Sequence, residues 1–264
     1  VWESFTHFGT CWFQAIFELE NVRLVSATFS SEKEGNADVI AETLLKILKQ
    51  AQLLNPDFLA SKTGFLVKTN LTFPQDWGLG SSSTLINNIA SWANVNAFDL
   101  LFHSFGGSGY DIACAQNNSP ITYQLVKPQP IVTIVQFEPS YLDSLFFVYL
   151  NKKQNSRDGI AHYRKNNQKI SKELDMISEL SNTFIQATSL KDVEKVIVEH
   201  EKVIASLIKT NPVKKTLFPD YFGEVKSLGA WGGDFVLATG NQDTPHYFQQ
   251  KGFSTIMPYQ DMVL

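Results

Sequence analysis

The residues best suited to chemistry form one short run: Gly78, Leu79, Gly80, Ser81, Ser82 and Ser83. The run follows residues 63–73, which alternate like a β-strand, and precedes residues 85–92, whose pattern favours a helix. Glycines allow a backbone to approach a ligand closely, and the free N–H groups of a helix start attract anions. The serine hydroxyls can cap the helix, bind phosphate oxygens or take one position on a magnesium ion. We therefore predict a phosphate-binding loop, with an ordinary capped helix start as the alternative.

A second run of interest covers residues 105–113, where three glycines surround a serine and an aspartate follows. Ser108 and Gly109 directly precede Tyr110 and Asp111. Because glycines carry no side chain, a carboxylate at Asp111 can come close to a bound ligand. The alternative is that Asp111 only caps the next helix.

A third glycine-rich run lies near the end of the chain, at residues 228–237. It contains Gly229, Ala230, Trp231, Gly232, Gly233 and Asp234 before an apolar segment. Such a run favours a loop in which backbone atoms line a binding site. We expect this loop to close the site, with Trp231 narrowing the pocket.

Neither of the common phosphate fingerprints fits the first run. No lysine follows Gly80, as a Walker A loop requires, and Ser83 stands where the dinucleotide fingerprint needs its third glycine. The three runs, in this order, instead resemble the later signatures of the GHMP kinases, the superfamily of galactokinase, homoserine kinase, mevalonate kinase and phosphomevalonate kinase. The first run departs from the family pattern at Ser83, where alanine is usual. The third departs at Trp231 and Asp234, where glycine or another small residue is usual.

The resemblance implies an ATP-dependent small-molecule kinase that uses ATP and Mg²⁺. It assigns the ATP phosphates to residues 78–83 and makes Ser82 the magnesium ligand. Asp111 becomes the catalytic residue, which orients or deprotonates the acceptor oxygen. Substrate contacts are implied for Ser108, Gly109, Gly229, Ala230, Trp231 and Gly232. No second magnesium ligand is assigned, because only Asp99 lies near the position where several members carry a glutamate.

A positively charged segment bears on the acceptor. Lys152 and Lys153 are followed by Ser156 and Arg157, and cations suit an anionic substrate through charge-assisted hydrogen bonds. The segment resembles one that faces the acceptor in some phosphomevalonate kinases, which implies substrate contacts from Lys153, Ser156 and Arg157. We therefore expect a small anionic acceptor, mevalonate or phosphomevalonate, and a role in isoprenoid biosynthesis. A charged surface turn is the alternative.

Two further interpretations of the family resemblance stay open. One is a catalytically inactive, nucleotide-binding or regulatory protein, which the altered third run and the unassigned magnesium ligand favour. The other is an ATP-dependent diphosphomevalonate decarboxylase, which uses the same fold.

Hydrophobic periodicity predicts an α+β protein. Strands are expected at residues 12–19, 23–29, 121–126, 131–137, 144–150, 234–239 and 253–257, and helices at residues 36–54, 160–188 and 191–209. Pro139 favours a boundary between an N-terminal lobe, residues 1–140, and a C-terminal lobe, residues 141–264. The closing strands and helices suit an antiparallel sheet covered on one face. The resemblance implies a two-lobed GHMP kinase fold, with a mixed sheet in the first lobe and a ferredoxin-like second lobe.

Composition narrows the classes of function. Lys and Arg total 22 against 26 Asp and Glu, a net charge of −4, so the chain offers no general basic field for nucleic acid. Its longest apolar runs are too short to span a bilayer, and its two cysteines, Cys11 and Cys114, favour a reducing compartment. We expect a cytoplasmic protein with no membrane or nucleic-acid partner, and a homodimer is left open. The family's first motif is absent from this chain, so we expect the full protein to begin earlier, with loss of that piece of the fold as the alternative.

Overall fold

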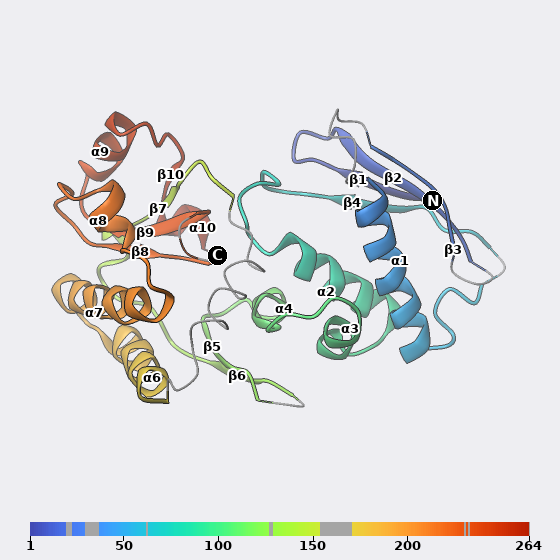
Figure 1. Ribbon diagram of the computed structural model, residues 1–264, viewed down its shortest axis with the longest axis horizontal. Helices are drawn as coiled ribbons and strands as arrows, with labels where there is room; N and C mark the ends of the chain where they lie inside the picture. Colours follow the sequence, from blue (N-terminus) through green and yellow to red (C-terminus); the bar gives the residue numbers. More distant parts are fainter. Residues whose placement is uncertain are drawn as a thin grey trace. The chain divides into compact units, whose positions relative to one another are not determined.

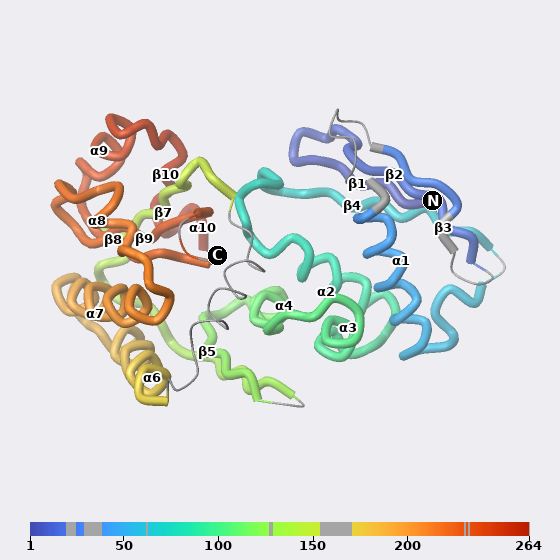
Figure 2. Tube along the Cα trace, in the orientation of Figure 1, coloured from blue at the N-terminus to red at the C-terminus, as the bar shows by residue number. Residues whose placement is uncertain are grey.

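The computed structural model of the chain describes residues 1–19, 23–29, 37–61, 63–126, 129–153, 171–229, 231 and 233–263. These residues form two compact units. Unit 1 contains residues 1–75 and 79–134, and unit 2 contains residues 76–78 and 135–264. Figures 1 and 2 show the elements of each unit in sequence colours. The lobe limits of 140 and 141 that the sequence suggests stay a prediction.

Unit 1 is built on a four-stranded mixed sheet. Its strands are β1 (Trp2–Phe5), β2 (Cys11–Glu18), β3 (Arg23–Phe29) and β4 (Val67–Asn70). Their order is β3-β2-β1-β4, in which β1 pairs antiparallel with β2 and parallel with β4. The strand predicted at residues 63–73 is thus only four residues long, because its partner β1 offers a ladder of only four residues, Trp2 to Phe5.

One face of this sheet packs on helices. Phe13 and Ala15 of β2 are buried, whereas Gln14 and Ile16 between them are exposed, which is the alternation of a sheet covered on one side. The helix that packs on the sheet is α1 (Ala37–Leu54), and α2 (Ser81–Ala93) and α3 (Ala97–Ser104) pack on α1. The buried residues of the three helices join those of the sheet in one core. The periodicity that predicted a helix at residues 36–54 is confirmed. Figure 1 shows α1 beside the sheet.

Two smaller elements complete unit 1. A short helix, α4 (Tyr110–Ala115), packs on α2, and a hairpin of β5 (Ile121–Gln124) and β6 (Ile131–Ile134) follows it. Both strands of this hairpin were predicted, with bounds that extend further than those observed. The helices α3 and α4 were not predicted, because eight and six residues are too few for a clear helical period.

Unit 2 is built on a four-stranded antiparallel sheet. Its strands are β7 (Leu145–Tyr149), β8 (Val225–Ser227), β9 (Phe235–Thr239) and β10 (Ile256–Pro258), in the order β10-β7-β9-β8. Its helices are η1 (Leu142–Ser144), α6 (Ser171–Gln186), α7 (Leu190–Ile208), α8 (Val213–Leu217), α9 (Thr244–Gln250) and α10 (Tyr259–Met262). The predicted α+β class and antiparallel second sheet are confirmed.

The expectation that helices cover only one face of this second sheet is wrong. All five residues of the central strand β9 are buried, although successive side chains point to opposite faces. Val236 and Ala238 belong to a core with Phe218 and Phe248, from the region of α8 and α9. Leu237, between them, belongs to a separate core with Ile197 of α7. The short helices α8 and α9, which periodicity did not reveal, supply the second layer.

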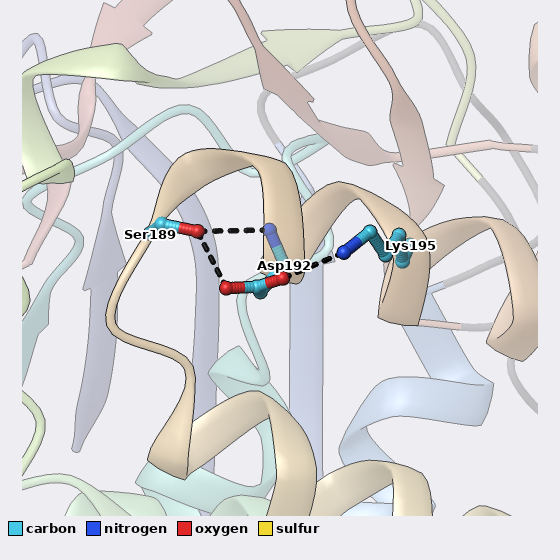
Figure 3. A network of polar contacts seen from close by, with 3 residues as sticks. All are labelled: Ser189, Asp192 and Lys195. Atoms are coloured by element: carbon cyan, nitrogen blue, oxygen red, sulfur yellow. Dashed lines mark hydrogen bonds and ion pairs between the residues drawn. The ribbon is translucent and has the colours of Figure 1, made fainter.

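The start of α7 is capped by side chains (Figure 3). The hydroxyl of Ser189 accepts a hydrogen bond from the backbone N–H of Asp192 at 3.2 Å and donates one to its carboxylate at 2.6 Å. Lys195 donates to the other carboxylate oxygen at 2.8 Å, and this contact, with that from Ser189, lowers the pKa of Asp192. A serine cap and an acidic first turn give the helix a defined beginning.

A buried carboxylate joins α7 to β8, the strand that leads into the third glycine run. Glu201 is 4% exposed and accepts hydrogen bonds from the backbone N–H and the hydroxyl of Ser227, both at 3.1 Å. The neighbouring Lys226 has a pKa lowered by burial, an effect that the charge of Glu201 opposes.

Within the described residues, no helix is both long and apolar enough to cross a membrane.

We expect the aromatic core of unit 2 to dominate its stability. Phe218 is fully buried, with ring centroids 4.9 Å from Phe248 and 5.2 Å from Phe253. Phe218→Ala should therefore lower the free energy of unfolding by about 3–5 kcal/mol, measured by urea denaturation. Phe222→Ala, at a phenylalanine 56% exposed, is the matched control and should change it by less than about 1 kcal/mol. Equal effects of the two substitutions would contradict this assignment of the core.

Candidate active site

The helix α2 begins without a side-chain cap. Its N-cap residue is Gly80, with φ 68° and ψ 24°, and in this fully described stretch no side chain caps the helix. The backbone N–H and hydroxyl of Thr84 both bond to the carbonyl oxygen of Gly80, at 3.0 and 3.2 Å. None of the three serines is therefore the N-cap that the alternative interpretation required. The backbone N–H groups of residues 81–83 are the first of the helix and have no side-chain cap, as an anion-binding helix start requires.

The carboxyl group of Asp111 lies against the backbone of Gly80. A Cβ atom placed on Gly80 would be 3.0 Å from Cγ and 3.2 Å from Oδ2 of Asp111. Asp111 is the second residue of α4, whose N-cap is Gly109, with φ 84° and no side-chain cap. Asp111 is therefore not the N-cap of this helix. The first and second glycine runs, 31 positions apart at these two residues, meet inside unit 1.

The pKa of the Asp111 carboxyl group is raised above the usual value of an aspartate. Crowding by surrounding protein atoms is the cause, although the residue itself stays open to solvent. Burial, followed by its contacts with Cys114, raises the pKa of the adjacent Tyr110 to about 12. A carboxylate with a raised pKa is a stronger base than an ordinary aspartate, so the site suits proton transfer or orientation of a hydroxyl.

Tyr123 of β5 holds the second glycine run in place. Its hydroxyl donates to the carbonyl oxygen of Ser108, and its ring lies edge-on to Tyr110 at 5.7 Å between centroids. The hydroxyl of Ser108 accepts the backbone N–H of Tyr110 at 3.2 Å. Gly109 is buried, and a Cβ atom there would be 3.0 Å from both the Phe98 ring and the Tyr123 hydroxyl. Sequence reasoning missed Tyr123, because nothing in its own strand marks this contact.

Residues 76–78, which lead into the first glycine run, belong to unit 2. The hydroxyl of Tyr149 donates to the carbonyl and carboxylate oxygens of Asp76, at 3.1 and 3.2 Å, and Trp77 packs edge-on to Phe235 with 5.4 Å between centroids. Burial, then the charges of Asp76 and Asp234, raise the pKa of Tyr149 to about 12. Tyr149 and Phe235 were not predicted as site residues, since their pattern is that of core strands.

The third glycine run keeps a glycine-like backbone even where glycine is replaced. Gly229, Trp231 and Asp234 have φ values of 61°, 58° and 53°. This is the left-handed region, which costs free energy for residues other than glycine. Asp234 is 8% exposed, and Trp231 is half-buried. The two departures from the family pattern therefore occupy positions where the chain conformation itself favours glycine.

The structure describes some of the remaining candidate residues but not all of them. Leu79, Ser82 and Lys153 are exposed, and Ser81 and Ser83 are half-buried. Ser156, Arg157, Ala230 and Gly232 lie outside the described residues. Asp99 lies in the first turn of α3, where its carboxylate accepts a hydrogen bond from Gln129 at 3.2 Å.

Comparison with solved structures finds a shared fold at low sequence identity. A Listeria innocua protein matches with a TM-score of 0.60 and 16% identity, over 97% of this chain and 84% of that one. Streptococcus pneumoniae phosphomevalonate kinase, in complex with phosphomevalonate and AMPPNP, matches with a TM-score of 0.60 and 15% identity, over 95% and 86%. L. major mevalonate kinase, in complex with R-mevalonate, gives 0.55 and 14%, over 81% and 73%. No protein-family model and no curated protein sequence matches the chain.

The second glycine run offers a matched pair of substitutions. Gly106 and Gly109 have φ values of 80° and 84°, but only Gly109 has heavy atoms where a Cβ would go. Gly106→Ala should cost about 1 kcal/mol of unfolding free energy through backbone strain. Gly109→Ala should cost about 1–3 kcal/mol more, because the aromatic rings of Phe98 and Tyr123 must move. Urea denaturation measures both, and equal losses would show that packing does not restrict position 109.

Proposed function

On the premise that the chain has the GHMP kinase fold, which agrees with its three motifs, we propose that it is an ATP-dependent small-molecule kinase. The observation that carries the proposal is the meeting of the uncapped start of α2 with the Asp111 carboxyl group at Gly80. The N-terminus of a helix can bind phosphate, and a carboxylate beside it can orient or deprotonate the acceptor hydroxyl. These two requirements of phosphoryl transfer come from different segments of unit 1.

Phosphoryl transfer asks mainly for positioning and charge stabilisation. In this proposal the backbone N–H groups and hydroxyls of residues 81–83 hold the ATP phosphates, and Gly78 and Gly80 let the backbone approach them. Asp111 orients the acceptor hydroxyl and takes its proton on a carboxylate oxygen as the new bond from the acceptor oxygen to the γ-phosphorus forms. The bond from that phosphorus to the β–γ bridging oxygen breaks in the same transfer, and ADP leaves. Its raised pKa supports this role, because proton transfer is most effective when the pKa of the base approaches the working pH.

The donor groups suit a magnesium ion that is bound largely by phosphate. Among the described residues there is no group of three His, Cys, Asp or Glu that could hold a metal. Magnesium commonly takes only one or two protein ligands and completes its shell with phosphates and water. The exposed hydroxyl of Ser82, at the start of α2, fits this pattern as the protein ligand. When bound, the ion would neutralise charge on the transferring phosphates.

We propose mevalonate or phosphomevalonate as the acceptor, in the cytoplasmic synthesis of isoprenoids. The support is the sequence resemblance at residues 152–158, together with two neighbours of the same fold whose structures hold R-mevalonate or phosphomevalonate. Lys153, Ser156 and Arg157 would contact the anionic acceptor, as would Ser108, Gly109 and the third glycine run.

One observation favours a second candidate, a nucleotide-binding protein without catalysis. The buried Asp234 places a carboxylate against Gly78, in the loop proposed to hold phosphates, where the family pattern has a small residue. The discriminating experiment is a screen of ATP consumption with mevalonate, phosphomevalonate, homoserine and sugars, with carbon dioxide release from diphosphomevalonate as a further arm. Nucleotide binding without turnover in any arm would favour this second candidate over the kinase.

Asp111→Asn tests the catalytic assignment. Loss of a positioned acid–base group should lower kcat by about 10² or more while the affinity for ATP stays nearly unchanged. Steady-state kinetics and AMPPNP titration measure the two quantities. Asp57→Asn, the same change at an exposed aspartate of unit 1, is the control and should keep kcat within about threefold. If Asp111→Asn retained full activity, the carboxylate would have no part in the reaction.

Ser82→Ala tests the metal assignment. Removing the proposed protein ligand should raise the magnesium concentration needed for half-maximal activity by about tenfold. Thr84→Ala is the control, because the Thr84 hydroxyl is already bonded to the Gly80 carbonyl oxygen and its removal should leave the magnesium requirement unchanged. A Ser82→Ala variant with the same magnesium requirement as the parent would remove Ser82 from the metal shell.

A further inference from the structure

We propose that Asp234 is a positioning residue that shapes the phosphate loop by occupying the space beside Gly78. A Cβ atom placed on Gly78 would lie 2.3 Å from Cγ, 2.4 Å from Oδ1 and 2.6 Å from Oδ2 of Asp234. The Asp234 carboxyl group thus fills the volume that a side chain at position 78 would need. Gly78 also has φ 69°, so backbone conformation and packing both restrict this position to glycine. The proposal rests on the proposed function, since it concerns how the same loop is held for nucleotide.

The backbone on either side of this carboxylate is fixed by unit 2. The N–H of Asp234 donates to the carbonyl oxygen of Lys152 at 2.6 Å, and its carbonyl oxygen accepts the N–H of Leu150 at 2.7 Å. Asp234 directly precedes β9, and Leu150 directly follows β7, so these bonds extend the β7–β9 ladder. Because the backbone is held on both sides and the side chain is buried, the carboxyl group cannot easily move away from Gly78.

Other contacts hold the same segment of the loop. Tyr149 bonds to Asp76, and Trp77 packs on Phe235, the residue after Asp234. These contacts hold the two residues before Gly78, whereas the Asp234 carboxyl group fills the Cβ position of Gly78 itself. A glycine at position 234, as in the family pattern, would leave that space empty. We infer that in this chain the third glycine run has a second role, because it sets the conformation of Gly78.

The proposal assigns the contribution to the space that the side chain fills beside Gly78. Two substitutions separate this effect of shape from an effect of charge. Asp234→Asn keeps the shape and tolerates the left-handed backbone, whereas Asp234→Gly removes the side chain and accepts φ 53° without strain. Both variants are therefore expected to fold.

The first test is a comparison of these two variants. Asp234→Gly should raise the KM for ATP by about tenfold, which corresponds to about 1.4 kcal/mol, with kcat within about threefold. Asp234→Asn should keep the KM for ATP within about twofold of the parent. A general loss of stability would not produce this selective change in KM or its rescue by asparagine. If Asp234→Gly left KM unchanged, or if asparagine behaved like glycine, the proposal would be overturned.

The second test is a double-mutant cycle of Gly78→Ala and Asp234→Gly, read out by AMPPNP affinity and by urea denaturation. Gly78→Ala suffers the same backbone strain in both backgrounds, but it collides with the carboxylate only when Asp234 is present. The factor by which Gly78→Ala weakens AMPPNP binding should therefore be at least about fivefold smaller in the Asp234→Gly background, and its loss of unfolding free energy should be smaller as well. Additive effects in both readouts would overturn the proposal that the Asp234 carboxyl group restricts Gly78.

The outcomes separate the two proposals. AMPPNP binding with a coupled cycle, but without turnover on any acceptor, would reject the kinase assignment and retain the role of Asp234. Turnover by the parent protein with an additive cycle would retain the kinase assignment and reject the role of Asp234. If the parent bound no nucleotide, the proposed function and the role of Asp234 in nucleotide binding would both be rejected.

Discussion

Two positions in the first glycine run strongly disfavour a side chain. Gly78 and Gly80 both have left-handed backbones, and each faces a carboxyl group at the place where a Cβ would stand. At Gly80 the carboxyl group is that of Asp111 in unit 1, and at Gly78 it is that of Asp234 in unit 2. The same absence of side chains that lets a backbone approach phosphate also lets these acids approach the backbone. The loop is therefore fixed in shape by its partners as well as by its own sequence.

The cores of the two units support these contacts. In unit 1, α2 and α4 pack together, and Tyr123 of β5 bonds to the second glycine run, so the Asp111 carboxyl group meets Gly80 on a packed scaffold. In unit 2, the central strand β9 is buried on both faces, and Asp234 directly precedes it. Carboxyl groups placed at the ends of such elements are held more precisely than residues in open loops.

Similarity of fold to the solved kinases persists at identities of 14–15%. At that level the fold is shared, but most side chains differ. Trp231 and Asp234 are two residues of the third glycine run that stand where the family pattern has glycine or another small residue. Both retain the backbone conformation that suits glycine, which indicates that the shape of the third run matters more than its composition. A left-handed backbone at Trp231 costs free energy, and such cost is commonly found at functional positions, whereas aspartate is one of the residues that tolerate this region best.

The sequence by itself determined the α+β class, the three glycine runs, and the helices predicted at residues 36–54 and 85–92, which the structure has as α1 and α2. Periodicity and glycine spacing are local signals. It did not reveal α3, α4, α8 and α9, which are too short to show a period, nor the second helical layer on the unit 2 sheet. Only the tertiary structure showed that Asp111 meets Gly80, that Asp234 meets Gly78, and that Tyr123 and Tyr149 bond to loop segments. These contacts join residues far apart in the sequence, and such pairings arise from packing, which no local pattern records.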